Sequence, residues 1–398
     1  MQTREKIKND ILNIQSNNIL LELSTGTGKT KLALDKIASF KYSNPKILIV
    51  IHRLVHEKNW IDEFIKWKYN KLLDNVTFTT YISLHKHIND WDIIIFDEAH
   101  SLSNRCRMLL KAYSWKKALL LSATIPNNLK EEFKIIFPNL YIYKLDIKEA
   151  IENNILPNPK VILLPQFLND TNCTESFTIP PKIKTDNSRT IEVYYNEYKK
   201  YTSLDTYTII VKCTEQQYYD RLCEVINIAK NIYNKKSSHY NKVKWLSLCN
   251  QRLKFLSDVK VRYTKKLLKI LNKERTLTFC NSIEQTLLLG QYCINSKNVH
   301  SKQILQDFNE GKINHITSCN MLNESINLVN CRIGIFNNIN ASDIITKQRN
   351  GRLLRHKNPI ILVPYYKYTR EEELVNSFKD TYVDYEEYYD IKHVKKIL

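Results

Sequence analysis

Short apolar runs without polar alternation recur along the chain, separated by stretches with helical spacing. Such runs are typical of strands that are covered on both faces. Their alternation with helices predicts βαβ units and parallel sheets. One series occupies the N-terminal part of the chain, at 18–23, 46–52, 76–81, 92–98 and 118–124. A second series follows later, at 276–280, 313–319, 332–338 and 360–366.

The two series predict an α/β fold with two lobes. We place the first lobe at 1–160 and the second at 261–366, with a linker and inserted segment at 161–260 and a tail at 367–398. Residues 166–195 are polar and are expected to form a linker or loose loops. The tail is acidic and rich in tyrosine, and either packs on the second lobe or contacts a partner.

The inserted segment is strongly basic. Residues 215–270 contain 13 Lys or Arg and 4 Asp or Glu, and its first part has the spacing of an amphipathic helix. Aromatic residues are interleaved with the charges: Tyr218, Tyr219, Tyr233, Tyr240, Trp245 and Phe255. The segment therefore either contacts nucleic acid or is a solvated helical insertion with ordinary core aromatics.

The whole chain carries a formal charge of +19 over 398 residues, which favours a polyanionic partner. Its nine cysteines form no CxxC pair, so neither a zinc ribbon nor a redox motif is indicated. Their unpatterned distribution favours a reducing, cytoplasmic location. No apolar run approaches the roughly 20 residues that span a bilayer, so we expect no membrane partner.

A glycine-containing loop joins the first apolar run to a helical stretch. The loop reads Ser24-Thr25-Gly26-Thr27-Gly28-Lys29-Thr30, the strand–loop–helix context of a P-loop. Its backbone N–H groups would face the phosphates of ATP, and its glycines would let the backbone approach closely. Lys29 would contact the β- and γ-phosphates, and the Thr30 hydroxyl would bind Mg²⁺. Leu23 stands where the motif has its first glycine.

An acidic pair, Asp97-Glu98, directly follows the apolar run at 92–98 and is followed by Ala99 and His100. Carboxylates at the carboxyl end of a strand are expected to lie beside a P-loop in such a sheet. Asp97 would hold Mg²⁺ through water, and Glu98 would orient and deprotonate the attacking water.

The P-loop, the acidic pair and Ser122-Ala123-Thr124, in this order and spacing, resemble superfamily 2 helicases of the DEAD/DEAH-box type, in particular the phage-encoded DEAH-like branch. The resemblance implies two RecA-like lobes and covers most of residues 1–366. It implies that Gln2 contacts adenine, and that Ser122-Ala123-Thr124 couples hydrolysis to lobe movement. It also implies that Arg53, in the segment 47–67, and Thr80 and Ser83, in the segment 80–86, contact the nucleic-acid backbone.

The second lobe carries two further matches to these helicases. The segment 320–328 resembles their fifth motif, with Asn323 as a candidate nucleic-acid contact and Ser325 in place of the usual glycine. Residues 348–355 read QRNGRLLR, and Arg352 and Arg355 share a helical face. The resemblance implies that Gln348 senses the γ-phosphate and that the two arginines act as arginine fingers. ATP would then bridge two lobes, and their closure would complete the site.

The sequence thus predicts an ATP- and Mg²⁺-dependent nucleic-acid motor, acting as a monomer. Our leading hypothesis is a DNA helicase of replication, recombination or repair in a bacterial or phage-infected cell. A Swi/Snf-type duplex translocase remains an alternative, as does an RNA helicase, although Gln348 stands where many RNA-acting members have histidine. From another class, a non-catalytic nucleotide-dependent binding module would be expected to lack Lys29, Glu98 or Arg352. No nuclease residues are evident.

Overall fold

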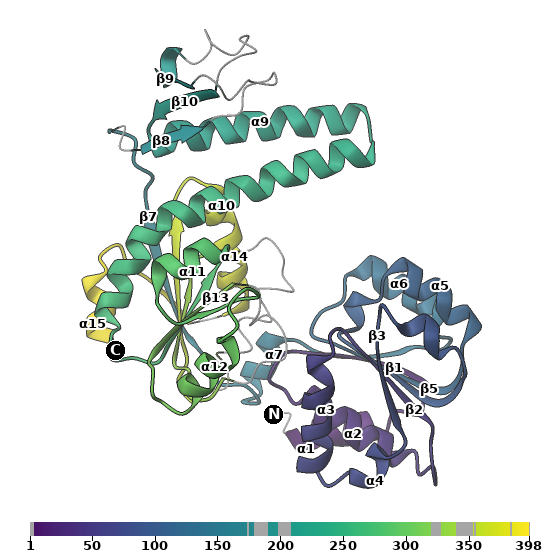
Figure 1. The fold of residues 1–398 in the computed structure, drawn as a ribbon. Coiled ribbons are helices and arrows are strands. Elements are labelled where there is room, and N and C mark those ends of the chain that lie inside the picture. The colour runs from purple at the N-terminus through teal and green to yellow at the C-terminus, as the bar shows by residue number, and fades with distance from the viewer. Residues whose placement is uncertain are drawn as a thin grey trace.

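The computed structural model describes residues 4–172, 175–178, 190–197, 208–319, 328–339, 353, 356–382 and 384–397. Two parallel sheets form separate lobes, and a long helical arm extends from the second lobe (Figure 1). The predicted α/β fold with two RecA-like lobes is confirmed. None of the helices within the described parts of the chain is long and apolar enough to cross a bilayer.

The first lobe contains a six-stranded parallel sheet in the order β3-β2-β4-β5-β1-β6. Its strands are β1 (Asn18–Leu23), β2 (Ile47–Ile51), β3 (Val76–Thr80), β4 (Asp90–Asp97), β5 (Ser114–Ser122) and β6 (Tyr141–Leu145). Its helices are α1 (Arg4–Leu12), α2 (Lys29–Ser39), α3 (Val55–Lys66), α4 (Asn70–Leu73), α5 (Asn104–Leu109), α6 (Asn127–Ile136) and α7 (Ile147–Glu152). Short 3₁₀ turns are η1 (Leu84–His87), η2 (Ala99–Ser101) and η3 (Leu110–Ala112).

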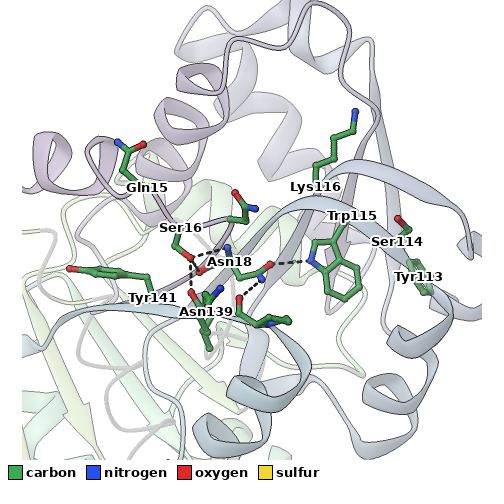
Figure 2. Close-up of a pocket in the computed structure, with 12 residues that line it drawn as sticks. Gln15, Ser16, Asn18, Tyr113, Ser114, Trp115, Lys116, Asn139 and Tyr141 are labelled. Atoms are coloured by element: carbon green, nitrogen blue, oxygen red, sulfur yellow. Dashed lines mark hydrogen bonds between the residues drawn. The ribbon is translucent and has the colours of Figure 1, made fainter.

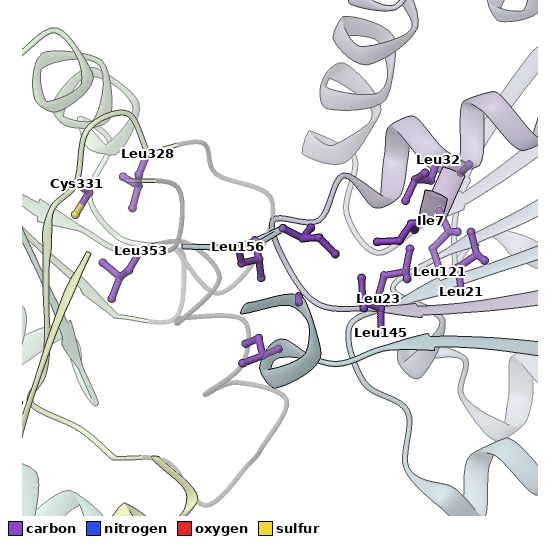
Figure 3. Packing of buried hydrophobic residues seen from close by; sticks show 14 of the residues in the cluster. Ile7, Leu21, Leu23, Leu32, Leu121, Leu145, Leu156, Leu328, Cys331 and Leu353 are labelled. Atoms are coloured by element: carbon purple, nitrogen blue, oxygen red, sulfur yellow. The ribbon is translucent and has the colours of Figure 1, made fainter. Parts of the chain in front are cut away.

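Both faces of this first sheet are covered, as the unbroken apolar runs predict. Successive residues of one strand enter different cores: Leu20 of β1 packs with one cluster and Leu21 with the other. Figure 3 shows Ile7, Leu32 and Leu121 gathered around β1, in the cluster that lies behind the P-loop. All six residues of β1 are buried, so the strand that carries the P-loop is fixed on both sides.

The second lobe contains a seven-stranded parallel sheet in the order β12-β13-β11-β14-β15-β7-β16. Its strands are β7 (Lys160–Gln166), β11 (Thr276–Cys280), β12 (Cys293–Ile294), β13 (His315–Cys319), β14 (Ile333–Phe336), β15 (Ile360–Tyr366) and β16 (Tyr385–Glu387). Its helices are α11 (Ile283–Leu289), α12 (Ser301–Asn309), α14 (Arg370–Thr381) and α15 (Lys392–Ile397).

The arm combines two long helices with a small sheet. The sheet has the order β8-β10-β9 and the elements β8 (Glu175–Thr178), β9 (Thr190–Tyr194), η4 (Tyr195–Glu197) and β10 (Thr208–Cys213). The helices are α9 (Glu215–Lys235) and α10 (His239–Ile270), which lie side by side and point away from the lobe (Figure 1). Thr214 and Gln217 form a reciprocal capping box that starts α9. The predicted amphipathic helix is present, whereas the strands were not expected.

Several elements of the second lobe lie outside the boundaries that we drew from the sequence. β7 pairs with β15 along its whole length, although residues 161–166 were grouped with the linker. β16 and α14 come from the predicted tail and complete the lobe, with β16 paired to β7. Pairing between strands about 200 residues apart leaves no local signal, because it depends on tertiary packing. The four-part division itself stays a prediction.

Candidate active site

The P-loop leaves β1 and enters α2 through two glycines in the left-handed region. Gly26 has φ 93° and Gly28 has φ 91°, where a side chain would be strained. Thr27 folds the loop onto itself, since its Oγ1 donates to Ser24 O at 2.7 Å. A Cβ placed on Gly28 would meet nothing within 4 Å. The space in front of this glycine is therefore open to a phosphate group.

The acidic pair lies at the carboxyl end of β4, and it lines the same cavity as the P-loop. Lys29 Nζ lies 3.7 Å from Glu98 Oε1, and both side chains are largely buried. Glu98 adopts φ 51°, a left-handed conformation that non-glycine residues seldom take. This turn directs its carboxylate at Lys29. The arrangement brings together a cation for phosphate and a base for water, the two groups that hydrolysis of a phosphoanhydride needs.

His100 connects Glu98 to the end of β5. Its Nδ1 lies 3.0 Å from Ser122 Oγ and 3.4 Å from Glu98 Oε2. Ser122 Oγ donates its own hydrogen to Thr124 O at 3.0 Å, so it must accept from His100. The network assigns a proton to Nδ1 of His100. Residues 122–124 are thus linked to the acidic pair through His100, by its hydrogen bond to Ser122 and its close contact with Glu98.

A cavity of about 500 Å³ adjoins the P-loop. Lys29, Thr30, Asp97 and Glu98 all line it. The described residues contain no group of three or more His, Cys, Asp or Glu that could hold a metal by themselves. This donor set suits Mg²⁺, which takes one or two protein ligands and completes its shell with water and nucleotide phosphates. Burial raises the pKa of Asp97 to about 6, helped by the charge of Glu98, so a cation here would be stabilising.

The three described residues that were predicted to contact nucleic acid lie at the same sheet edge. Arg53 follows β2 and is exposed, while Thr80 ends β3 and Ser83 lies in the next turn. β2 and β3 are adjacent, with Ile51 paired to Thr80, so the two loops are neighbours. Ser83 N donates to Thr80 O at 3.0 Å, which closes the turn.

Five predicted site residues lie outside the described residues: Gln2, Asn323, Gln348, Arg352 and Arg355. Leu353, within the same arginine-containing segment, is described and completely buried. It packs on Gly334 of β14, where an added Cβ would overlap the leucine side chain. The glycine therefore provides the space that Leu353 fills.

Two residues that contact Asp97, and one buried acid next to the segment 122–124, were not identified from the sequence. Trp60 Nε1 donates to Asp97 Oδ2 at 3.0 Å, and the Tyr81 hydroxyl donates to Asp97 O at 2.8 Å. Glu22, a buried acid within β1, accepts from Ile125 N at 3.1 Å and pairs with Lys130. A carboxylate in an otherwise apolar strand was the one available signal for Glu22.

A larger cavity, of about 850 Å³, lies at the opposite edge of the first sheet, where β1, β5 and β6 begin (Figure 2). Its polar groups bond to one another: Trp115 Nε1 donates to Asn18 Oδ1 at 3.0 Å, and Ser16 Oγ donates to Asn139 O at 2.6 Å. The P-loop and the acidic pair contribute nothing to its lining. We therefore assign the reaction to the smaller cavity.

A P-loop and an acidic pair at one edge of a parallel sheet, joined to a second parallel lobe, define a two-lobed P-loop ATPase. Comparisons narrow this class. Residues 2–127 match the family described as "Type III restriction enzyme, res subunit", and residues 259–357 match "Helicase conserved C-terminal domain". The first match covers most of the first lobe and the second lies in the second lobe, and together they support a nucleic-acid-dependent ATPase of the helicase type.

Individual relatives are distant. The chain is 22% identical over 341 residues to the Arabidopsis thaliana "Protein CHROMATIN REMODELING 4". This match covers 70% of this chain but only 15% of the length of that protein. Saccharomyces cerevisiae Dbp5 bound to RNA and ADP BeF3 has a similar fold, with a TM-score of 0.58, 11% identity, and coverage of 98% of this chain and 92% of Dbp5. A Vibrio vulnificus fragment described as a putative HsdR subunit of a type I restriction enzyme also has a similar fold. Its TM-score is 0.56 and its identity is 14%, with coverage of 96% of this chain and 67% of that chain.

Proposed function

We propose that the protein is a Mg²⁺- and ATP-dependent DNA helicase of the DEAH-like, phage-type branch, and that it works as a monomer in replication, recombination or repair. The observation that carries the proposal is the Lys29–Glu98 pair, 3.7 Å apart beside an open P-loop. A cytoplasmic location belongs to the same proposal. The proposed roles of Gln2, Gln348, Arg352 and Arg355 rest on the sequence motifs alone.

Hydrolysis begins with the nucleotide phosphates drawing Lys29 away from Glu98. The freed carboxylate then takes a proton from the attacking water, whose oxygen forms a bond to the γ-phosphorus as the bond to the β–γ bridging oxygen breaks. Mg²⁺, held by Thr30 and through water by Asp97, would neutralise charge that builds up on the leaving phosphates. Water attack yields ADP and inorganic phosphate, and no further reactant is needed.

His100 and Ser122 connect the movement of Glu98 during hydrolysis to the rest of the first lobe. Both Glu98 and Ser122 lie against Nδ1 of the same imidazole, so a shift of Glu98 alters the bond to Ser122. Ser122 in turn holds Thr124 O. The result is a short path from the reacting phosphate to the segment 122–124, which we propose transmits lobe closure.

The charge of the arm favours nucleic acid as the polymer along which the protein moves. Residues 225–257 contain seven Lys or Arg and no Asp or Glu. Five of these lysines are exposed on the outer parts of α9 and α10: Lys230, Lys235, Lys236, Lys242 and Lys244. Such a concentration of one charge on a projecting element is the electrostatic footprint of phosphate binding. We propose that the arm is a second nucleic-acid contact, additional to Arg53, Thr80 and Ser83 on the first lobe.

A duplex translocase is the second candidate, favoured by the similarity to a chromatin remodelling protein. The two functions differ in what they do to a duplex. A helicase releases a fluorescent strand from a forked duplex, whereas a translocase displaces a third strand from a triplex and leaves the duplex paired.

The first experiment measures ATP hydrolysis alone and with single-stranded DNA, duplex DNA or RNA. We expect DNA to stimulate hydrolysis by the wild type, and Lys29→Ala to hydrolyse no ATP. Glu98→Gln should still bind the nucleotide, but its hydrolysis rate should be about 10²–10⁴-fold lower, because the base is lost. Stronger stimulation by RNA than by DNA would mean that the protein acts on RNA. ATP binding without hydrolysis in any of these mixtures would refute the motor and support a nucleotide-dependent binding module.

A further inference from the structure

Two buried aromatic side chains hold the carboxyl-terminal residue of β4 from two directions. Trp60, on α3, donates its indole N–H to Asp97 Oδ2 at 3.0 Å. Tyr81, just after β3, donates its hydroxyl to Asp97 O at 2.8 Å. Trp60 is 2% exposed and Tyr81 is 7% exposed, so neither ring can move without the element that carries it. Burial and the charge of Asp97 raise the pKa of Tyr81 well above its usual value, so the phenol keeps its proton.

Each ring is attached to a loop that we propose contacts nucleic acid. Arg53 O accepts from His56 N at 2.9 Å, which ties the Arg53 loop to the first turn of α3. Trp60 lies on the same helix, about one turn after His56. Tyr81 directly follows Thr80, and its N–H donates to Ile51 O at 3.3 Å. The two loops are therefore bonded to each other as well as to Asp97.

The outer ends of the same loops carry apolar side chains in water. Leu54 is 70% exposed and Ile82 is 86% exposed. They lie beside Arg53 on one loop and between Thr80 and Ser83 on the other. A strand whose phosphates contact Arg53, Thr80 and Ser83 would cover these side chains with its sugars. Occupation of this surface would thus press on the two elements that carry Trp60 and Tyr81.

We propose that Trp60 and Tyr81 are positioning residues that convey nucleic-acid binding from the Arg53 and Thr80 loops to Asp97. The inference rests on the proposed function and goes one step beyond it. Binding at the outer loops shifts α3 and the Tyr81 turn, and the two hydrogen bonds, one to the carboxylate and one to the backbone carbonyl, carry that shift to Asp97, which would hold Mg²⁺ through water. By reciprocity, a nucleotide bound at Asp97 alters the affinity of the loops for nucleic acid.

Ordinary packing would also bury a tryptophan, but it does not select this acceptor. A buried indole N–H needs some partner, and two other tryptophans of the first lobe find partners far from the P-loop. Trp91 donates to His87 O at 3.1 Å, and Trp115 donates to Asn18 Oδ1 (Figure 2). Trp115 therefore offers a matched control: its conversion to phenylalanine removes the same kind of bond at the opposite sheet edge.

The test compares Trp60→Phe and Tyr81→Phe with two controls, Trp115→Phe and Tyr113→Phe. Tyr113 is a buried tyrosine whose hydroxyl donates to Leu84 O. Affinity for a fluorescent single-stranded oligonucleotide is measured with and without a non-hydrolysable ATP analogue and Mg²⁺. We expect the wild type and both controls to show a nucleotide-dependent change of about five-fold or more. In Trp60→Phe and Tyr81→Phe the ratio falls toward one, while affinity without nucleotide stays within about two-fold.

Steady-state hydrolysis gives the second readout, the ratio of rates with and without DNA. We expect this ratio to fall in the two test variants alone. Equal loss of basal and stimulated rates, with an unchanged affinity ratio, would mean that the aromatics only support Asp97 and would overturn the inference. A wild type that responds to no polymer would refute the proposed function itself. If Trp60→Phe does not fold, Tyr81→Phe, which removes a single hydroxyl, decides the matter.

Discussion

At the scale of single residues, the site stores strain where the chemistry is expected. Glu98 is held at φ 51°, a conformation that costs on the order of 1 kcal/mol or more in a non-glycine residue. Hydrogen bonds around it compensate: Glu98 N donates to Asp97 Oδ1 at 3.0 Å, and Tyr81 holds the preceding carbonyl. The strained turn is what lets two successive carboxylates face one cavity, because side chains of an extended strand would point to opposite faces.

On the second lobe, Gly334 leaves the space that the side chain of Leu353 occupies. Gly334→Ala should displace Leu353, since the added methyl overlaps its side chain. We expect a loss of about 1–3 kcal/mol in the free energy of unfolding, measured by urea denaturation. Combining it with Leu353→Ala should recover part of that loss, because the smaller side chain frees the space that the methyl needs. A double variant whose loss equals the sum of the two single losses would contradict this contact.

His315, on β13, should make the protein sensitive to acid. Burial lowers its pKa from 6.5 to about 4, and its Nε2 lies 3.1 Å from Thr278 Oγ1. Because the folded pKa lies below the unfolded one, this contribution to stability is complete above pH 6.5 and is lost as the pH falls toward 4. His315→Gln should therefore lose less stability than the wild type between pH 7 and 4.5, by about 1–3 kcal/mol. Parallel urea midpoints for the two proteins would exclude the effect.

At the scale of elements, α10 is both half of the arm and part of the second lobe. Its Lys260 is fully buried and pairs with Glu371 of α14 at 2.5 Å. Ser257 and Thr264, also fully buried, bond to Asn337 just after β14. The helix is therefore fixed to the lobe on two sides, so the arm moves with the second lobe.

Removing one partner of the Lys260–Glu371 pair should be costly. Lys260→Met leaves Glu371 buried without its cation, for which we expect a loss of about 3–5 kcal/mol in the free energy of unfolding. Lys260→Met with Glu371→Gln should be close to wild type, because the neutral amide oxygen still accepts from Tyr366 N. Chemical denaturation of the three proteins measures both. If the double variant were as unstable as Lys260→Met alone, the loss of stability would come from lost packing and not from the unpaired charge.

The sequence predicted those elements whose signals are local. β1, the P-loop and α2 follow from an apolar run, two glycines and a helical stretch within about 20 residues, and the structure has them as expected. β7 and β16 were not predicted as strands of the second sheet, since their pairing is set by distant partners. Trp60 and Tyr81 were missed for a related reason. Both are ordinary aromatic residues in sequence, and only the packing of α3 and β3 against β4 brings them to Asp97.

At the scale of the whole molecule, the proposed nucleic-acid contacts fall on both lobes. Arg53, Thr80 and Ser83 lie on the first lobe, and the basic arm is fixed to the second. A cavity of about 520 Å³ is lined by Gly26 of the P-loop, by residues 154–158 of the connecting segment and by Lys357 of the second lobe. We propose that a change in the P-loop that alters the lining of this cavity changes the distance between the two contacts, as stepping along a strand requires.

The arm's contribution can be separated by its salt dependence. Replacing Lys235, Lys236 and Lys242 with Ala should weaken binding to all DNA sequences alike, because phosphate contacts carry no sequence information. Each lost contact lowers the slope of log affinity against log salt concentration by about 0.9 on a duplex, so three together lower it by roughly 2–3.

The matched control replaces three exposed lysines at or near the opposite edge of the first sheet, Lys46, Lys71 and Lys116, which changes the net charge equally. Fluorescence anisotropy at several salt concentrations measures both slopes. If the arm binds phosphates directly, the slope falls only in the arm variant. If both variants lose the same slope, the effect is one of overall charge, and the arm is not a nucleic-acid contact.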